Sequence, residues 1–427
     1  MSHASFEDLG VAVEITEALD AAGIRRPFAI QASTIPLALD GKDIIGQART
    51  GSGKTLSFAI PVLDRVFDDA ALPELNGKPH AVILVPTREL AQQVTGDVEL
   101  AGQNLPVQVL TVVGGVPMEA QKKALKRGVD IIIGTPGRII DLYKQGALDF
   151  SEIGIVVLDE ADEMLDLGFY PDIEYLMKEL PEARQNLLFS ATMPGAILSL
   201  ARQFMRHPVR VQDEKQEQNT VNQAVEQIIF QAHQMDKIEI LARALQSPKH
   251  KKSITFVKTK RQAAALSGDL AKLGFVVGAV HGDMQQSERE RSLQAFRDNE
   301  IKILVATDIA ARGLDIDDIS HVFNYQIPDD AMTFIHRSGR TGRAGMKGIS
   351  VTMVGYDETT RWAGIAEDLK LNPNPPQWFS TSDELYAALD IPAGTGPSIG
   401  PARKVFGAKS PAASRTIRRP RVRRAKR

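Results

Sequence analysis

One short stretch of the chain has the composition of a phosphate-binding loop. Residues 48–55 read ARTGSGKT. Glycines at 51 and 53 would let backbone N–H groups curl around phosphates, and Lys54 could reach the outer phosphates. The hydroxyl of Thr55 could hold Mg²⁺. Because the first glycine of the usual pattern falls on Ala48, the loop needs support from elsewhere in the chain.

Two acidic residues supply that support. Asp159 and Glu160 follow residues 153–158, IGIVVL, whose apolar side chains predict a strand buried on both faces of a parallel sheet. Ligands of such sheets bind beyond the carboxyl ends of the strands, so both acids would face a binding crevice. Alone, the two acids could form a turn that caps the next helix. Beside a phosphate loop, Asp159 is predicted to hold the metal, and Glu160 to orient or deprotonate an attacking water.

The composition sets the size and general class of the protein. The chain has 427 residues, 43% of them hydrophobic, which is enough for two or three domains with large cores. The absence of cysteine excludes disulfide bonds and cysteine zinc sites, and the eight histidines lack metal-ligand spacing. The first residues do not resemble a signal peptide and no apolar run is as long as a membrane span, so we expect a cytoplasmic protein.

The net charge of −2 conceals an uneven distribution. Residues 391–427 hold 11 Lys and Arg and no Asp or Glu, whereas residues 1–390 hold 40 basic and 53 acidic residues. The end of the chain is therefore strongly basic. Such a segment indicates an arm that binds a polyanion such as nucleic acid, or only a solubilising tail.

Strand-like apolar runs alternate with helical stretches along most of the chain, which predicts α/β domains with helices on both faces of parallel sheets. The polar stretch 212–223 predicts a linker. We expect domains at 1–211 and 224–372, a short extension at 373–390 and a disordered basic tail at 391–427. The predicted strands are 81–85, 107–112, 129–133, 153–158 and 186–189, then 253–258, 275–280, 301–306, 321–325 and 348–353. Helices are predicted within 6–31 and at 31–39, 54–67 and 378–389.

Two further groups could complete a nucleotide site. Gln31 could be an ordinary helix residue, but its carboxamide could also read an adenine by donating and accepting at once. Residues 336–343, HRSGRTGR, combine three arginines and a histidine with glycines. This stretch could be a solvated basic surface. Placed across a cleft from the phosphate loop, its arginines would instead stabilise the charge that develops during hydrolysis.

With these motifs identified, residues 6 to about 370 resemble the DEAD-box RNA helicases of superfamily two. The tetrapeptide at 159–162 is DEAD itself, and the family's phosphate loop commonly begins with alanine, as at Ala48. The stretch at 4–32 is similar to the family's adenine-sensing motif, although Phe28 stands where threonine is more frequent. The resemblance implies two tandem RecA-like domains that bind ATP and Mg²⁺ and act on RNA, in the short core form of bacterial members with a basic tail.

The resemblance also implies roles for individual residues. Nucleotide contacts are implied for Phe6, Gln31, Ala48, Arg49, Thr50, Gly51, Ser52, Gly53, Lys54, Thr55 and Asp315. Thr55 and Asp159 would bind Mg²⁺. Catalytic roles are implied for Lys54, Asp159, Glu160, Arg312, His336, Arg340 and Arg343, the last two as arginine fingers. Coupling of hydrolysis to strand separation is implied for Asp162, Ser190 and Thr192, with Asp162 reaching His336 across the cleft.

RNA contacts are implied in both domains. They fall on Pro86, Thr87, Arg88, Gly115, Thr135, Gly137 and Arg138 in the first and on Thr259, Gln286, Arg289 and Thr307 in the second. Such groups hold phosphate and sugar rather than base edges, so binding should not depend on sequence. A preference for RNA over DNA would come from contacts to the 2′-hydroxyl.

The predicted function is an ATP-dependent RNA helicase, in which closure of the two domains locally unwinds short duplexes or remodels RNA–protein complexes. The alternative is an ATP-gated RNA clamp or scaffold with incidental unwinding, which slow turnover would favour. A DNA translocase is a more remote possibility. The basic tail would add RNA affinity through phosphate contacts.

Overall fold

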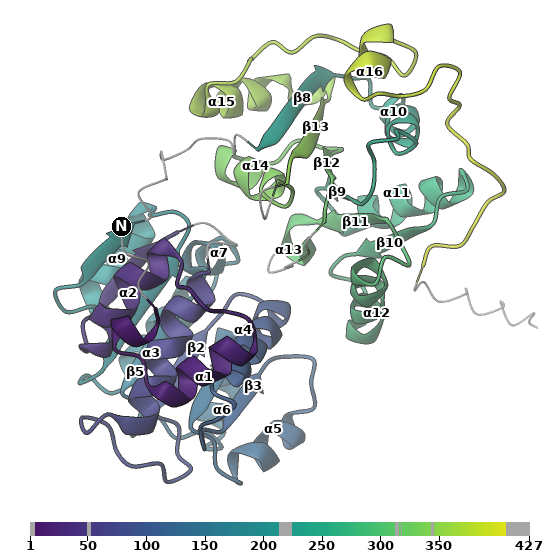
Figure 1. Cartoon of the computed structure of the whole chain (residues 1–427). Helices are drawn as coiled ribbons and strands as arrows, with labels where there is room; N and C mark the ends of the chain where they lie inside the picture. Colours follow the sequence, from purple (N-terminus) through teal and green to yellow (C-terminus); the bar gives the residue numbers. More distant parts are fainter. Residues whose placement is uncertain are drawn as a thin grey trace, which may run out of the picture.

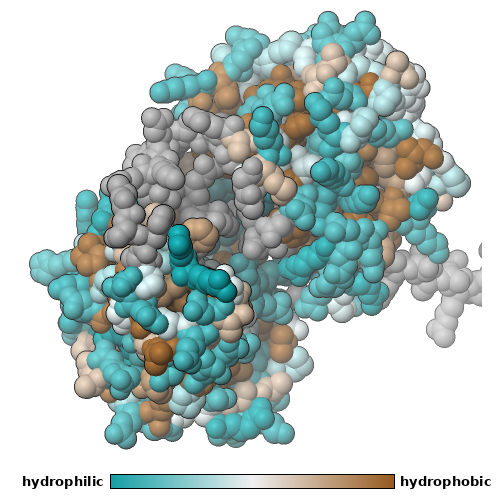
Figure 2. Space-filling model, in the orientation of Figure 1, coloured by the Kyte–Doolittle hydropathy of each residue, from teal (hydrophilic) through white to brown (hydrophobic). Residues whose placement is uncertain are grey.

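The computed structural model describes residues 5–48, 53–212, 224–311, 316, 318–342 and 346–406. It contains two α/β domains, one built on a seven-stranded sheet and one on a six-stranded sheet (Figure 1). The strand pairs that the described residues form in both sheets are parallel. The prediction of two tandem parallel-sheet domains is therefore confirmed. The visible face of both domains is largely hydrophilic, with apolar residues in separate patches (Figure 2).

The first sheet has the strand order β3-β4-β2-β5-β6-β1-β7. Its strands are β1 (Ile44–Gln47), β2 (Ala81–Leu84), β3 (Val109–Val112), β4 (Ile131–Gly134), β5 (Ile155–Leu158), β6 (Gln185–Ser190) and β7 (Val209–Gln212). The helical segments are η1 (Glu7–Leu9), α1 (Val13–Ala21), α2 (Ala29–Leu39), α3 (Lys54–Asp68), α4 (Arg88–Ala101), α5 (Met118–Leu125), α6 (Pro136–Lys144), α7 (Ala161–Asp166), α8 (Tyr170–Glu179) and α9 (Gly195–Phe204).

The second sheet has the strand order β10-β11-β9-β12-β13-β8. Its strands are β8 (Val225–Gln231), β9 (Ser253–Val257), β10 (Val277–Val280), β11 (Ile303–Thr307), β12 (His321–Asn324) and β13 (Gly348–Val354). The helical segments are α10 (Lys237–Ala244), α11 (Lys260–Lys272), α12 (Gln286–Arg297), α13 (Asp308–Ala311), α14 (Ala331–Ser338), η2 (Tyr356–Glu358), α15 (Thr359–Leu369) and α16 (Asp383–Ala388). None of the helices in the described part of the chain is long and apolar enough to cross a membrane.

The apolar runs form strands because both faces of each sheet are covered. Along β5, Ile155 and Val157 point into one hydrophobic cluster, and Val156 and Leu158 into another on the opposite face. All four side chains are buried. Successive side chains of a strand point to opposite faces, so only a nearly continuous apolar run satisfies both cores.

The order of the central strands decides where the functional residues meet. β6 lies between β1 and β5. Because these three strands are parallel, the segments that follow them emerge at one edge of the sheet. Those segments are the phosphate loop after β1, Asp159 and Glu160 after β5, and Thr192 after β6.

Three strands were not among those predicted: β1, β7 and β8. β1 is short and reads IIGQ, and β7, VRVQ, alternates with polar residues. Both form because tertiary pairing completes them, β1 between β6 and β7, and β7 along the outer side of β1. Local propensity is a weaker determinant of strands than such pairing.

The start of the predicted disordered tail must be corrected. Residues 391–406 run as an extended strap around the outside of the second domain, the yellow segment that follows α16 (Figure 1). The backbone N–H of Arg403 donates to Ala271 O at 2.7 Å, and that of Phe406 to Val277 O at 2.9 Å on the edge strand β10. The prediction of disorder was wrong for residues 391–406 because this segment hydrogen-bonds to the second domain and therefore needs no hydrophobic core of its own. Residues 407–427 lie outside the described residues.

Candidate nucleotide and RNA site

A cavity of about 640 Å³ lies beyond the ends of β1 and β5. It brings together residues that the sequence analysis assigned to one site, from both domains. The first domain contributes Gln31, Gly53, Lys54, Thr55, Asp159 and Glu160, and the second contributes His336 and Arg340. Arg49, Thr50, Gly51, Ser52, Arg312, Asp315 and Arg343 lie outside the described residues.

The phosphate-loop lysine and the acidic pair are in direct contact. Lys54 Nζ lies 2.8 Å from Glu160 Oε1, and both side chains are largely buried. Burial alone would lower the pKa of Lys54, but the carboxylates of Glu160, Asp159 and Asp162 outweigh it and raise that pKa. The lysine is therefore held as a cation at the position where phosphate charge would enter.

Asp159 is a strongly perturbed carboxyl group. It is 3% exposed, and burial, followed by repulsion from Glu160, raises its pKa to about 7. Glu160 has φ of +49°, a left-handed conformation that non-glycine residues seldom adopt. Its backbone N–H donates to Asp159 Oδ1 at 3.0 Å. Perturbed pKa values and unusual backbone conformations are both concentrated at functional sites.

The residues around Asp159 fit a magnesium ion that is shared with a phosphate ligand. The carboxylates of Glu160 and Asp162 add negative charge around Asp159, which Lys54 opposes, and a bound cation would reduce that charge further. Within the described ranges, no group of three or more His, Cys, Asp or Glu side chains could hold a metal ion alone. Mg²⁺ at phosphate sites is usually held by one or two carboxylates together with phosphates and water. Asp159 and the Thr55 hydroxyl match that donor set.

Gln31 links α2 to the phosphate loop. Its Nε2 donates to Gly53 O at 2.9 Å, and its Oε1 accepts from the backbone N–H of Phe28 at 2.8 Å. The predicted partner Phe6 is placed differently. It is 3% exposed in the hydrophobic core with Val11 and is not among the residues that line the cavity, and its nucleotide contact stays a prediction.

The predicted coupling residues form one hydrogen-bonded group. The backbone N–H and the hydroxyl of Thr192 both donate to Asp162 Oδ2 at 2.8 Å. Ser190 Oγ accepts from the backbone N–H of Asp162 at 3.2 Å and donates to Thr192 O at 2.7 Å. The segment after β6 is thus tied to the helix that carries the acidic tetrapeptide. The reach of Asp162 to His336 stays a prediction.

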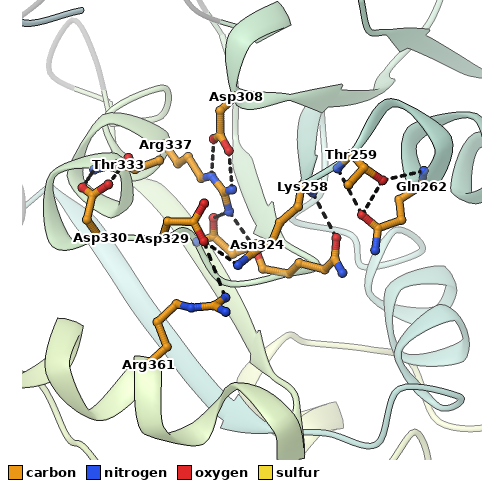
Figure 3. A network of polar contacts seen from close by, with 11 residues as sticks. Lys258, Thr259, Gln262, Asp308, Asn324, Asp329, Asp330, Thr333, Arg337 and Arg361 are labelled. Carbon is orange, nitrogen blue, oxygen red and sulfur yellow. Dashed lines mark hydrogen bonds and ion pairs between the residues drawn. The ribbon is translucent and has the colours of Figure 1, made fainter. Parts of the chain in front are cut away.

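The arginine-rich stretch of the second domain divides into two parts. Arg337 does not face a phosphate: it is 2% exposed and donates to both carboxylate oxygens of Asp308, at 2.5 and 2.7 Å (Figure 3). It also donates to Asn324 Oδ1 at 3.1 Å and lies over the Phe256 ring. The prediction that all three arginines of residues 336–343 are aimed at phosphate is therefore wrong for Arg337. Arg337 fixes α14 to the sheet, which positions the last turn of that helix.

The neighbours of Arg337 have the expected position. His336 and Arg340 both line the cavity that contains Lys54 and Glu160. They lie before and after Arg337 in the sequence, so the bonds of Arg337 to Asp308 hold the segment from which both reach the cavity. Ala48 extends the β1 ladder, where its N–H donates to Ser190 O at 3.2 Å.

The predicted RNA residues of the first domain gather around a glycine pair. The guanidinium of Arg88 packs so closely on Gly115 that a Cβ there would lie 1.9 Å from Nη1. Gly115 also has φ of +78°, which glycine adopts without strain. Arg138 Nη1 donates to Val116 O at 2.9 Å. The remaining members are Pro86, Thr87, Thr135 and Gly137, at or near the starts of α4 and α6.

The second domain places its predicted RNA residues at helix starts and strand ends. Thr259 is the N-cap of α11 and Thr307 ends β11. Arg289 on α12 lies 3.0 Å from Glu89 on α4 of the first domain, joining the two sets. Gln286 begins α12.

Sequence reasoning assigned no role to several cavity residues, although three of them lie in the stretch at 4–32 that resembles the adenine-sensing motif. They are Arg25, Arg26, Phe28, Leu90, Gln93, Asp97 and Glu163. The pair at 25–26 lies only five to six residues before Gln31, which was the available signal. Nothing in the sequence indicated that Gln93 and Asp97 on α4 line a cavity, because a polar residue on a helix usually faces solvent.

Two parallel-sheet domains with a phosphate loop, an acidic pair and arginine from the second domain define a two-domain nucleoside triphosphatase class. Residues 28–200 match the DEAD/DEAH box helicase family, and residues 236–345 match the helicase conserved C-terminal domain. The chain belongs to the DEAD-box ATP-dependent RNA helicase family.

Individual relatives agree with this assignment. The chain is 43% identical over 350 residues to the DEAD-box ATP-dependent RNA helicase CshA of Geobacillus kaustophilus, covering 82% of this chain and 73% of that protein. It is 42% identical over 353 residues to the mitochondrial DEAD-box ATP-dependent RNA helicase 9 of Arabidopsis thaliana, covering 82% of this chain but only 57% of the plant protein. The structure of S. cerevisiae Dbp5 bound to RNA and ADP BeF3 matches with a TM-score of 0.79 and 30% identity, covering 90% of this chain and 98% of that one.

Proposed function

We propose that this protein hydrolyses ATP when RNA is bound and uses closure of its two domains to unwind short RNA duplexes or to remodel RNA–protein complexes. The observation that carries the proposal is that one cavity holds Lys54 and Glu160 from the first domain and Arg340 from the second. An arginine from across the cleft can stabilise transition-state charge only when the two domains approach each other. Binding of RNA across both domains would favour that approach.

In the proposed mechanism, Lys54 binds the outer phosphates, and its release from Glu160 frees that carboxylate to orient the attacking water. Asp159 and Thr55 would hold Mg²⁺, which neutralises phosphate charge when bound. Arg340 stabilises the charge that develops on the transferred phosphoryl group. Arg343, Arg312 and Asp315 keep the roles that the sequence predicts for them.

RNA binding is proposed to run over the segments that Arg289 and Glu89 join. Arg88 and Arg138 offer guanidinium groups, while Thr87, Thr135 and Thr259 stand at the N-caps of helices, where backbone N–H groups attract phosphate. The basic tail is proposed to add RNA affinity through phosphates. The cytoplasmic location stays a prediction of the sequence.

Two variants test the assignment of the acidic and basic groups. Glu160→Gln should retain ATP and RNA binding and lower turnover about 100-fold or more, since it removes the group that acts on water. Lys54→Ala should lose ATP binding, measured by calorimetry. Near-normal steady-state hydrolysis by Glu160→Gln would contradict the role of that carboxylate. If the protein acts as an RNA clamp instead, the wild type should show slow turnover and long-lived RNA complexes.

A further inference from the structure

Phe28 has an unusual position for an aromatic residue. It is the N-cap of α2, where a side-chain oxygen normally accepts a hydrogen bond from the first turn, and a phenyl ring cannot do so. The ring is 62% exposed, so it is not held in the core either. A large apolar ring that neither caps its helix nor packs inside the domain requires another explanation.

The ring lies against the phosphate loop. A Cβ placed on Gly53 would lie 2.5 Å from Cδ2 of Phe28 and 2.6 Å from Nε2 of Gln31. The two side chains therefore rest together on the glycine that precedes Lys54, and both line the cavity. Any side chain at Gly53 would collide with them.

The two side chains differ in what they can recognise. The carboxamide of Gln31 can donate and accept, so it can distinguish one base edge from another. The Phe28 ring has no hydrogen-bonding group and offers only an apolar surface. Every nucleobase has an apolar face, so a contact with such a ring tolerates any base.

We propose that Phe28 forms an apolar wall for the base and ribose of a bound nucleotide, and that it strengthens binding equally for all bases. The inference rests on the proposed ATP function. It predicts a division of labour in which Phe28 contributes affinity and Gln31 contributes the preference for adenine. Burial of the exposed ring by the ligand supplies the driving force.

The test uses the full chain and calorimetric titration with ADP and GDP, which requires neither RNA nor hydrolysis. Phe28→Thr introduces a favourable N-cap side chain, so α2 should not be weakened. We expect the dissociation constants for ADP and GDP both to rise about 3- to 10-fold, an order of magnitude suited to partial burial of one ring. Their ratio should stay within about twofold. Phe28→Leu, which keeps an apolar side chain, should change both constants by less than about threefold.

Two variants serve as controls. Phe379→Thr makes the same substitution at another exposed phenylalanine, 49% exposed in the second domain, and should leave both constants unchanged. Gln31→Ala should instead change the ratio between ADP and GDP. In steady-state assays, Phe28→Thr should raise the KM for ATP by a similar factor while kcat at saturating ATP stays within about twofold.

Several results would overturn the inference. Unchanged ADP affinity in Phe28→Thr would make the ring an ordinary surface residue. A changed ADP-to-GDP ratio would mean that the ring takes part in base discrimination, and a lowered kcat with unchanged KM would assign it to the chemical step. If the wild-type protein binds neither nucleotide, the proposed function fails together with this inference. Wild-type binding with an unaffected Phe28→Thr variant refutes only the role of the ring.

Discussion

Arg289 and Glu89 form an ion pair between the two domains, with Nε of the arginine 3.0 Å from Oε1 of the glutamate. The side chains are only 17% and 6% exposed. Arg289 also donates through Nη2 to Ala310 O at 3.1 Å. Burial lowers the pKa of Arg289, and the charge of Glu89 opposes that effect. The pair connects the segments that are predicted to bind RNA on either side of the cleft.

The first prediction concerns the coupling of these two residues. Glu89→Gln and Arg289→Gln should each raise the RNA concentration for half-maximal ATPase about 5- to 20-fold, because each leaves a partly buried charge unpaired. The double variant should be no worse than the worse single variant, as measured in a double-mutant cycle. Glu99→Gln, an exposed change on the same helix, is the matched control. Additive effects would show that the residues act independently.

The second prediction concerns the anchor of α14. Arg337→Met should lower the stability of the second domain by about 3–5 kcal/mol, because it leaves Asp308 without its bidentate partner in a largely buried network. Thermal unfolding should show the loss, and RNA-stimulated turnover should fall as His336 and Arg340 lose their placement. Arg361→Met, at a pair on the exposed side of the same network, is the control and should cost about 1 kcal/mol or less (Figure 3). Equal melting temperatures for the two variants would contradict this structural role.

The third prediction is a loss of stability at acidic pH that arises from a half-buried histidine, His250, and a buried one, His321. Burial, followed by repulsion from His321 and Lys302, lowers the pKa of His250 to about 3. Burial, followed by Lys249, lowers the pKa of His321 to about 4. Because the unfolded chain takes up these protons near pH 6.5 and the folded chain does not, unfolding becomes easier as the pH falls from about 6.5 toward 4.

The size of this effect can be measured by thermal unfolding of the full chain between pH 7.5 and 5. Each histidine contributes up to about 1.4 kcal/mol per pH unit within the window. His321→Asn removes one of these groups, so its melting temperature should fall less steeply with acid than that of the wild type. The comparison uses slopes, which separates proton uptake from any constant cost of the substitution. Identical slopes would rule out His321 as a source of the acid sensitivity.

The fourth prediction separates the strap from the basic tail. Removal of 407–427, which carries nine Lys and Arg residues, should raise the RNA requirement at moderate salt and leave turnover at saturating RNA nearly unchanged. The melting temperature should not change. Removal of 391–427 should also lower the melting temperature, because Phe406 and Arg403 no longer bond to β10 and the end of α11. An unchanged RNA requirement in the shorter deletion would identify the tail as a solubilising segment.

Much of the fold could be predicted from local patterns. The strand at β5 was visible because a doubly buried strand must be apolar throughout. The phosphate loop and the acids at 159–160 were visible because few residue types can perform their chemistry. β1 could not be predicted, because a strand of four residues that contains a glycine has no clear apolar pattern. Gly46 is needed there because a Cβ at this position would lie 2.5 Å from the Phe189 ring.

Other features depend on tertiary contacts that no local pattern contains. Arg337 and Arg340 belong to one basic motif, yet one is paired inside the domain and the other lines the cavity. Which arginine is paired inside the domain depends on the position of Asp308, 29 residues away in the sequence, and cannot be inferred from spacing. The pairing of Arg289 with Glu89 joins residues 200 positions apart, and it depends on how the two domains are arranged.

The most direct test of the central claim is ATP hydrolysis by the purified full chain without nucleic acid, with single-stranded RNA and with DNA of the same sequence, at two salt concentrations. If RNA closes the two domains around Lys54, Glu160 and Arg340, RNA should stimulate hydrolysis strongly and DNA should not. The RNA requirement should rise with salt. Equal stimulation by DNA, or no stimulation by RNA, would contradict RNA-driven closure of this site.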